Sequence, residues 1–520
     1  MNMQEMGFSR IVLICFLWVE ACGGGGGESS SPAVSKLVIS SRPLAVQKGT
    51  SVQLTAIATD SSGNPVSQPG LTWSVDGGFG TITSGGLYSA PANIPAQNPV
   101  TVRATSVADS TKNDAVSFYI LTGVPIAFPF QPTDTLFPQQ GSPASFHIAV
   151  FNQNTYVVWA MTSGIYGTHL WYSKKGDLNG NFSTPHDILG DLLNYTITNY
   201  TVKNPVIALD NKVDASGIDP GVYIAWDDNS NGAYQVNLVK GPNSSSTGCT
   251  HPPTCFTPVA LTGPGNAISL QVDPSPSDQE NPSLAISPLG KLEFAWTQVY
   301  SSSSATSNLI TYKELNGDGS VPKPPSQVSP SQTQTSQITP QIAVDHSGNV
   351  SVSWLDFNSG TSPPNILYSR MAVGQSFGSA LPVETESLAP SDTFSMALDD
   401  KGQPHLAWSK TSSGTPTVVY YSTTSDFSKF TIPVNLTPGG YHPVVKVDLL
   451  NYLYFTWEDG ISSLYFKKIA PLPNSGALTN SPLTKTGVNP AMNIDDEGRV
   501  YLLYSTTGSI NLSTYFMRGD

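Results

Sequence analysis

Apolar and polar residues alternate in short runs along most of the 520-residue chain, and clusters of Gly, Pro, Ser, Asn and Asp separate these runs. Alternation with a period of two places neighbouring side chains on opposite faces of a β-strand, and the intervening clusters are typical of turns. Only 12% of the residues are charged, which disfavours long surface helices. The pattern predicts an all-β protein with enough apolar residues for more than one core.

One strand-turn-strand pattern recurs from about residue 123 onwards. In "AVDHSGNVSVSW", which ends at Trp354, an apolar strand leads to an Asp, a tight turn with Gly, and a second strand closed by an aromatic residue. In five copies the aromatic follows the Asp or Ser by nine positions, as Trp354 follows Asp345. This spacing identifies an internal repeat. The other regular copies close at Trp296, Trp408, Trp457 and Tyr504, and two irregular copies close at Trp159 and Trp226.

Each copy is followed by a third strand, such as "NILYSRM", and often by a fourth, such as "FTIPVNLT". A four-stranded antiparallel sheet cannot bury both of its faces alone, but several sheets arranged radially can. We therefore expect a β-propeller over residues 122–520, with seven blades. Rings of six or eight blades are the alternatives, because the first copies are irregular.

Closure of the ring can also be predicted. The last copy, residues 490–516, contains three recognisable strands, whereas the apolar segment 124–130, "VPIAFPF", has no partner before the first copy. We expect this segment to pair as the outermost strand of the last blade, which would leave no strand edge open. Pro125 and Pro129 fit such an edge position.

Residues 37–121 differ from the repeats. Alternating runs such as "SVQLTAIA" and "VTVRATSV" lie between turns at a spacing typical of β-sandwiches. Motifs at Gly49, around Trp73 in "TWSV", and in "GTITSGGLYSAP" resemble the group 2 bacterial Ig-like domains (BIG2). The resemblance implies an Ig-like β-sandwich that serves as a spacer or adhesive module, with Trp73 and Tyr88 in its core.

The N-terminus carries Arg10, an apolar run at residues 11–19 and then small residues before Cys22. This pattern indicates an export signal that is too short to span a bilayer. "VEAC" resembles the bacterial lipobox, which implies a signal peptide at residues 1–21 and a lipidated Cys22 with a Gly/Ser tether at residues 22–36. We expect an exported protein, lipid-anchored at the cell envelope at the outer membrane or cell surface. An ordinary cleaved signal followed by a linker is the alternative.

Cys249 and Cys255 lie close together in "CTHPPTC", and we expect a disulfide between them after export. A metal site that also uses His251 is the alternative, but these residues do not make a zinc motif. The segment "DLNGN" at residues 177–181 spaces oxygen ligands as calcium loops do, yet it lacks the late bidentate Glu. We expect neither a bound metal nor a cofactor.

The net charge of −13 argues against nucleic-acid binding, because phosphate neutralisation needs clustered Lys and Arg. We expect a monomer that binds a glycan or a surface protein and contacts the membrane through its lipid anchor alone.

The repeats resemble those of sialidase-like (BNR-type) propellers, as in "PQIAVDHSGNVSVSW" followed by "ILYS". Sialidases bind the carboxylate of their substrate with three arginines. Residues 122–520 contain only Arg370, Arg499 and Arg518, and "FTIP" has Thr431 where the family has an arginine. The resemblance therefore implies the fold, and the missing arginines argue against sialidase activity.

Cleavage of a glycosidic bond needs two carboxyl groups beside that bond. Five acids follow the closing aromatic residues, where the loop between the second and third strands begins. They are weak catalytic candidates, since acids in turns are ordinary: Asp227, Asp228, Asp356, Glu458 and Asp459. Acids of the hairpin turns, such as Asp345, Asp399 and Asp495, fit a structural role through side-chain to backbone bonds.

Two functions fit these observations. The first is a non-enzymatic surface lipoprotein whose Ig-like stalk presents the propeller for glycan or protein binding. The alternative is an extracellular glycoside hydrolase or polysaccharide lyase of sialidase-like fold that uses the acids named above.

Overall fold

The structure is a computed structural model, and it describes residues 33–67, 70–121, 134–138, 145–151, 153–162, 168–176, 181–189, 201–210, 221–229, 232–241, 256–258, 277–301, 306–317, 324–328, 335–358, 365–383, 393–412, 415–438, 440–459, 461, 463–469, 481–506 and 509–515. The elements whose bounds lie within the described residues are strands, apart from the short 3-10 helix η1 (Asp76–Gly78), and residues 188–189 are helical. The all-β prediction is confirmed. The residues of the predicted signal, Cys22, Cys249, Cys255 and residues 177–180 lie outside the described parts.

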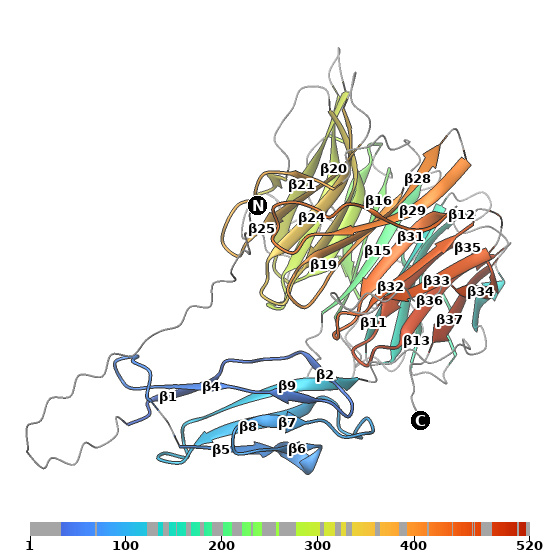
Figure 1. The fold of residues 1–520 in the computed structure, drawn as a ribbon. Helices are drawn as coiled ribbons and strands as arrows, with labels where there is room; N and C mark the ends of the chain where they lie inside the picture. Colours follow the sequence, from blue (N-terminus) through green and yellow to red (C-terminus); the bar gives the residue numbers. More distant parts are fainter. Residues whose placement is uncertain are drawn as a thin grey trace, which may run out of the picture.

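The first nine strands form the predicted Ig-like β-sandwich, drawn in blue in Figure 1. Val102, Phe118 and Tyr88 lie in its core, where the Tyr88 ring packs edge-on against Phe118, while Trp73 is half-buried against the same cluster. The strands group into three sheets: β1 (Lys36–Ile39) with β4 (Ala56–Thr59); β2 (Ala45–Gln47), β9 (Asn113–Leu121), β8 (Val100–Ser106) and β5 (Leu71–Val75); and β3 (Ser51–Gln53), β7 (Leu87–Ser89) and β6 (Thr81–Ile82).

The remaining strands form four-stranded antiparallel units that follow one another along the chain, and we number them as blades. Blades 3 and 4 are joined into one eight-stranded sheet by a single parallel pair, Asn308 with Ser336. Blade 1 contains β11 (Ser145–Phe151), β12 (Asn154–Thr162), β13 (Thr168–Lys175) and β14 (His186–Asp187); blade 2 contains β15 (Val202–Asp210), β16 (Gly221–Asp228), β17 (Gln235–Lys240) and β18 (Thr257–Pro258); blade 3 contains β19 (Gln279–Ile286), β20 (Leu292–Ser301), β21 (Thr306–Leu315) and β22 (Ser326–Gln327).

Blade 4 contains β23 (Thr335–Val344), β24 (Val350–Asn358), β25 (Asn365–Met371) and β26 (Leu381–Pro382); blade 5 contains β27 (Phe394–Leu398), β28 (Pro404–Ser412), β29 (Thr415–Thr423) and β30 (Val434–Pro438); blade 6 contains β31 (Tyr441–Val447), β32 (Leu453–Glu458), β33 (Ser463–Ile469) and β34 (Ser481–Thr486). Blade 7 contains β35 (Val488–Ile494), β36 (Val500–Thr506), β37 (Ser509–Tyr515) and, from the other end of the chain, β10 (Asp134–Pro138).

The first strand of each blade packs against the first strand of the next, and β35 of blade 7 packs against β11 of blade 1. The described residues thus form a closed ring of seven four-stranded units, which is a β-propeller (Figure 1).

The aromatic residue that closes each repeat is buried on the second strand of its blade. Trp226 of blade 2 packs with Tyr156 and Val158 of blade 1, and Trp354 of blade 4 packs with Ile310 of blade 3. Each of these side chains therefore fills the space between its own blade and the preceding one. The repeated aromatic residue in the sequence is the contact that joins neighbouring blades.

The acids of the hairpin turns are structural, as expected. Asp345 Oδ1 accepts hydrogen bonds from the backbone N–H groups of Ser347 and Asn349, both at 2.9 Å. The same pair of bonds recurs at Asp399, Asp448 and Asp495. Gly348 has a φ of 85°, which explains the glycine in most copies of this turn.

Closure differs from the prediction in one respect. The outermost strand of blade 7 is β10, with Thr135 opposite Asn511 and Leu136 opposite Ile510. The expectation that residues 124–130 fill this place was therefore wrong, and those residues lie outside the described parts. A proline is tolerated at this outer edge, since β10 itself ends at Pro138 opposite Ser509. The first four residues of β10 carry no proline, whereas residues 124–130 contain two.

The sandwich contacts the ring at the end where the first two strands of blade 7 turn. Tyr119 Oη of β9 donates a hydrogen bond to Asp496 Oδ2 at 3.1 Å. Burial raises the pKa of the Asp496 carboxyl group, and the neighbouring charges of Asp495 and Glu497 raise it further. This contact places the sandwich beside one face of the ring (Figure 1).

We predict that breaking the pairing of β10 with β37 destabilises the ring. Replacing Thr135 and Leu136 together by proline removes backbone donors on both sides of the strand. We expect Tm to fall by several degrees, because a loss of 1 kcal/mol lowers Tm by about 2–4 °C even in a domain of 150–250 residues. The matched control is Ile126→Pro, in the segment that does not fill the closing place, and we expect it to leave Tm within about 1 °C of wild type. Equal effects of the two changes in a thermal melt would contradict the assignment of β10 as the closing strand.

Candidate functional site

Five first strands carry an X-Pro pair at which the pairing with the second strand shifts register. In each pair the residue before proline has a positive φ, between 47° and 54°. Glycine, asparagine, aspartate and histidine adopt this conformation more readily than other residues, so its occurrence in the β-branched Thr339 is unusual. The five residues are Asn204, Asn281, Thr339, His442 and Asn489.

These bulges lie at the same end of the ring as the residues that follow the closing aromatic. Lys203, beside Asn204, pairs with Asp227, and Tyr441, beside His442, pairs with Glu458. We call this end of the ring the bulge face. The hairpin turns and the contact with the sandwich lie at the opposite end, which we call the turn face.

Asp227 is fully buried on the bulge face of blade 2. Its Oδ1 accepts a hydrogen bond at 3.0 Å from Asn204 Nδ2, which also donates to Asn281 Oδ1 of blade 3 at 2.9 Å. Burial raises the pKa of the Asp227 carboxyl group to about 7, and the charge of Glu280 adds to this effect, while Asn204 and Lys203 oppose it. Near neutral pH both protonation states are populated, as a general acid or base requires.

His442 and Glu458 form a pair across the bulge of blade 6. His442 Nδ1 contacts Glu458 Oε1, and Glu458 is buried while 44% of the His442 side chain is exposed. When Nδ1–H of the imidazole donates a hydrogen bond to the carboxylate, Nε2 is the basic nitrogen. The pair can therefore present an oriented base to a ligand on the bulge face.

Several buried polar atoms on the bulge face have no hydrogen-bond partner among the described residues. They include Asp227 Oδ2, Thr339 Oγ1, Asp356 Oδ1 and Glu458 Oε2, and also Thr297 Oγ1 beside the bulge of blade 3. Burial also raises the pKa of the Asp356 carboxyl group, although Gln337 opposes the shift through a hydrogen bond. Buried polar groups are nearly always paired in folded proteins, so unpaired atoms at one end of a ring mark a candidate binding site.

The other two sequence candidates have structural roles. Asp228 Oδ2 accepts hydrogen bonds from Trp226 Nε1 at 2.6 Å and from Asn237 Nδ2 at 2.9 Å, so it orients the closing tryptophan. Asp459 Oδ1 accepts bonds from the backbone N–H groups of Ile461 and Ser463 and holds the following turn. The structure thus separates Asp227, Asp356 and Glu458 from Asp228 and Asp459.

Sequence reasoning missed His442, Asn204 and Thr339. A signal was present, because a proline follows each of them at the same place in its repeat: Pro443, Pro205 and Pro340. The consequence of that proline, a bulge that turns the preceding side chain towards the acids, depends on pairing with the second strand.

Among the described residues, no group of three or more His, Cys, Asp or Glu side chains is placed to hold a metal ion. No helix in the described parts is long and apolar enough to cross a membrane.

No family model and no curated protein matches the sequence. Solved structures do match the fold. A polysaccharide lyase, Uly1, aligns with a TM-score of 0.51 at 10% identity, over 75% of this chain and 100% of the lyase. An ulvan lyase of family PL25 aligns at 0.48 and 10% identity, over 73% of this chain and 98% of its own. An α-L-arabinanase from Penicillium chrysogenum aligns at 0.39 and 10% identity, over 74% and 98%. At these identities the likeness shows the propeller fold.

The raised pKa of Asp227 predicts a pH-dependent stability. Because the folded pKa of about 7 lies above the ordinary 3.8, the native state holds this proton more tightly than the unfolded chain. Stability is therefore lost as pH rises between those two values. Asp227→Asn stays neutral and keeps an acceptor for Asn204, so it should raise Tm by roughly a few degrees at about pH 8.

At about pH 4, where wild-type Asp227 is protonated in the native state, the two proteins should melt at nearly the same temperature. Differential scanning calorimetry at both pH values provides the measurement. A wild type that is more stable than Asp227→Asn at the higher pH would rule out the buried, proton-holding carboxyl group.

Proposed function

We propose that the protein is an exported enzyme that cleaves glycosidic bonds of a polysaccharide at the bulge face of the propeller. The observation that carries the proposal is the set of unpaired buried polar atoms of Asp227, Thr339, Asp356 and Glu458 at that face. Leaving such atoms without partners costs stability, and this cost is typical of sites built for a ligand. The polysaccharide lyase among the solved structures with this fold fits the proposal.

Asp227 suits the role of general acid. Its pKa of about 7 keeps the carboxyl group partly protonated near neutral pH, so it can give a proton to the leaving oxygen of a glycosidic bond.

The His442–Glu458 pair suits the role of base. In a hydrolase it would activate the attacking water, whereas in a lyase it would remove the proton beside a uronate carboxylate. The bulge itself belongs to the repeat, since four other blades have the same backbone conformation at this place, and it is the imidazole of His442 that is particular to blade 6.

The functional acids lie on the ring, and the sandwich lies beside its opposite face, so the sandwich can act as a stalk without covering the site. We propose that residues 37–121 serve as this stalk and residues 122–520 as the glycan-acting domain of a monomer. We also propose that the N-terminal signal exports the chain, that Cys22 anchors it to the cell envelope, and that Cys249 and Cys255 form a disulfide.

We predict that His442→Ala, Glu458→Gln and Asp227→Asn each lower kcat by about 10²–10⁴-fold, the usual contribution of a general acid or base. The assay measures release of reducing ends from a panel of soluble polysaccharides. Ultraviolet absorbance of the products then distinguishes a lyase, whose products carry a conjugated double bond, from a hydrolase.

The matched control is Asp400→Asn, an exposed acid on a hairpin turn at the turn face, which should retain wild-type activity. Absence of cleavage across the panel, with polysaccharides still bound, would replace the enzyme with a binding protein. Cleavage that survives in all three variants would refute the assignment of the site.

The anchor can be tested separately. We expect cells given a radioactive fatty acid to label the wild-type protein and not Cys22→Ser, because the cysteine thiol is the acceptor of the lipid. Equal labelling of both proteins would exclude lipidation at Cys22.

A further inference from the structure

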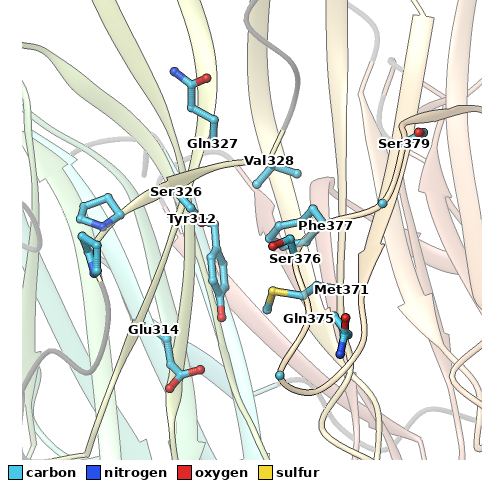
Figure 2. Close-up of a pocket in the computed structure, with 14 residues that line it drawn as sticks. Tyr312, Glu314, Ser326, Gln327, Val328, Met371, Gln375, Ser376, Phe377 and Ser379 are labelled. Atoms are coloured by element: carbon cyan, nitrogen blue, oxygen red, sulfur yellow. The ribbon is translucent and has the colours of Figure 1, made fainter.

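A cleft of about 840 Å³ lies between the outer strands of blades 3 and 4 (Figure 2). Glu314 on its wall pairs with Glu293 just after the hairpin turn of blade 3, and Met371 pairs with Val350 just after that of blade 4. The cleft therefore opens at the turn face, away from Asp227 and His442. Its volume falls within the range of roughly 300–1,000 Å³ that small-ligand sites occupy.

The walls of the cleft combine fixed apolar surfaces. Figure 2 shows Tyr312 on one side and Met371 and Phe377 on the other, and the adjacent Pro324 and Pro325 also line the cleft. Tyr312 Oη donates a hydrogen bond to buried Glu293 Oε2 at 2.6 Å, and the Phe377 ring lies edge-on to the Tyr312 ring at 5.2 Å. Tyr312 itself is buried, so the apolar surface that a ligand can reach comes from Pro324, Pro325, Met371 and Phe377. Because the buried rings hold this surface in place, a ligand would lose little free energy in ordering it.

Exposed polar side chains lie at the edge of these walls. Gln327 and Gln375 are exposed, and neither amide group makes a side-chain hydrogen bond within the described parts of the chain. The hydroxyl groups of Ser326 and Ser376 lie beside them. Together they offer both donors and acceptors next to apolar surface.

The charge of the cleft restricts its ligand. Glu314 is the one charged side chain among the residues that line it, and its carboxylate already contacts Lys291 Nζ. No cation is left to pair with a phosphate, a sulfate or a uronate, so the cleft favours a neutral ligand.

A peptide is also disfavoured. The strands that border the cleft at its outer edge, β22 and β26, contain two residues each, so they offer too short an edge for an added strand.

A sugar fits the cleft better. Pyranose and furanose rings have apolar C–H faces and hydroxyl edges, and these match apolar side chains on the walls and amide groups at the rim.

We propose that this cleft is a second, non-catalytic binding site for a neutral stretch of a glycan chain. The inference rests on the proposed function, since it places a holding site for polysaccharide on the face opposite the one where cleavage occurs. The site would keep a polymer attached while other parts of it reach the bulge face.

Affinity electrophoresis of the full chain in native gels that contain xylan, arabinan, galactomannan or laminarin tests the proposal. Gln375→Trp fills the cleft from an exposed loop, and the double change Gln327→Ala with Gln375→Ala removes both amides. The matched control is Ser428→Trp, at the corresponding position of the loop in blade 5 and outside the cleft. His442→Ala with Glu458→Gln serves as the background without cleavage.

We expect at least one of these neutral polysaccharides to retard the wild type, the background variant and Ser428→Trp. We expect both cleft variants to lose about fivefold or more of the affinity. The tryptophan takes up the space of the ligand, and in the double variant each lost hydrogen bond weakens binding severalfold. Their cleavage of short oligosaccharides should stay at the wild-type rate. No retardation of the wild type by any of the four, or unchanged retardation of Gln375→Trp, would overturn the cleft site. Failure of the proposed enzyme activity would show instead as absent cleavage by the wild type, whatever the retardation.

Discussion

The propeller depends on the burial of one aromatic side chain between each pair of neighbouring blades. A four-stranded sheet has two apolar faces, and the tryptophans at Trp226, Trp354 and the equivalent positions cover them by packing against the preceding blade. Removal of such a side chain costs about 3–5 kcal/mol, which is a large part of the typical stability of a protein. Since each blade covers only its neighbours, the ring must close, and β10 closes it by pairing with β37.

The repeat that builds the ring also builds the site. Because the second strand of each blade must place its aromatic residue between blades, the residue that follows it always emerges at the bulge face. Most copies place a neutral residue there, such as Thr297, Ser409 or Ser505, whereas two place the acids Asp227 and Glu458. The X-Pro bulge of the first strand then brings Asn204 or His442 within contact of these acids. A regular scaffold thus produces an irregular site through substitutions at equivalent positions.

The two faces of the ring differ in how their acids are satisfied. At the turn face, Asp345, Asp399 and Asp448 accept paired backbone bonds, which is an arrangement that stabilises hairpins and leaves no free acceptor on that oxygen. At the bulge face, Asp227, Asp356 and Glu458 each keep an oxygen without a partner. This contrast lies within one chain and one type of blade. It is therefore the difference in hydrogen bonding, more than the presence of acids, that distinguishes the candidate site from the hairpin turns.

The sequence alone determined the strand pattern, the repeat with its closing aromatic residue and the structural role of the turn acids, because these depend on residues close together in the chain and on a period that recurs. It also indicated five acids beside the closing aromatics. Only the tertiary structure separated them. Asp228 accepts a hydrogen bond from Asn237, and Asp459 accepts one from the backbone of Ser463. Asp227 and Glu458 instead contact the bulge residues Asn204 and His442 of the first strands. It also decided the closing strand and the cleft between blades 3 and 4. These features join segments far apart in sequence, and their positions depend on register and packing that no local pattern contains.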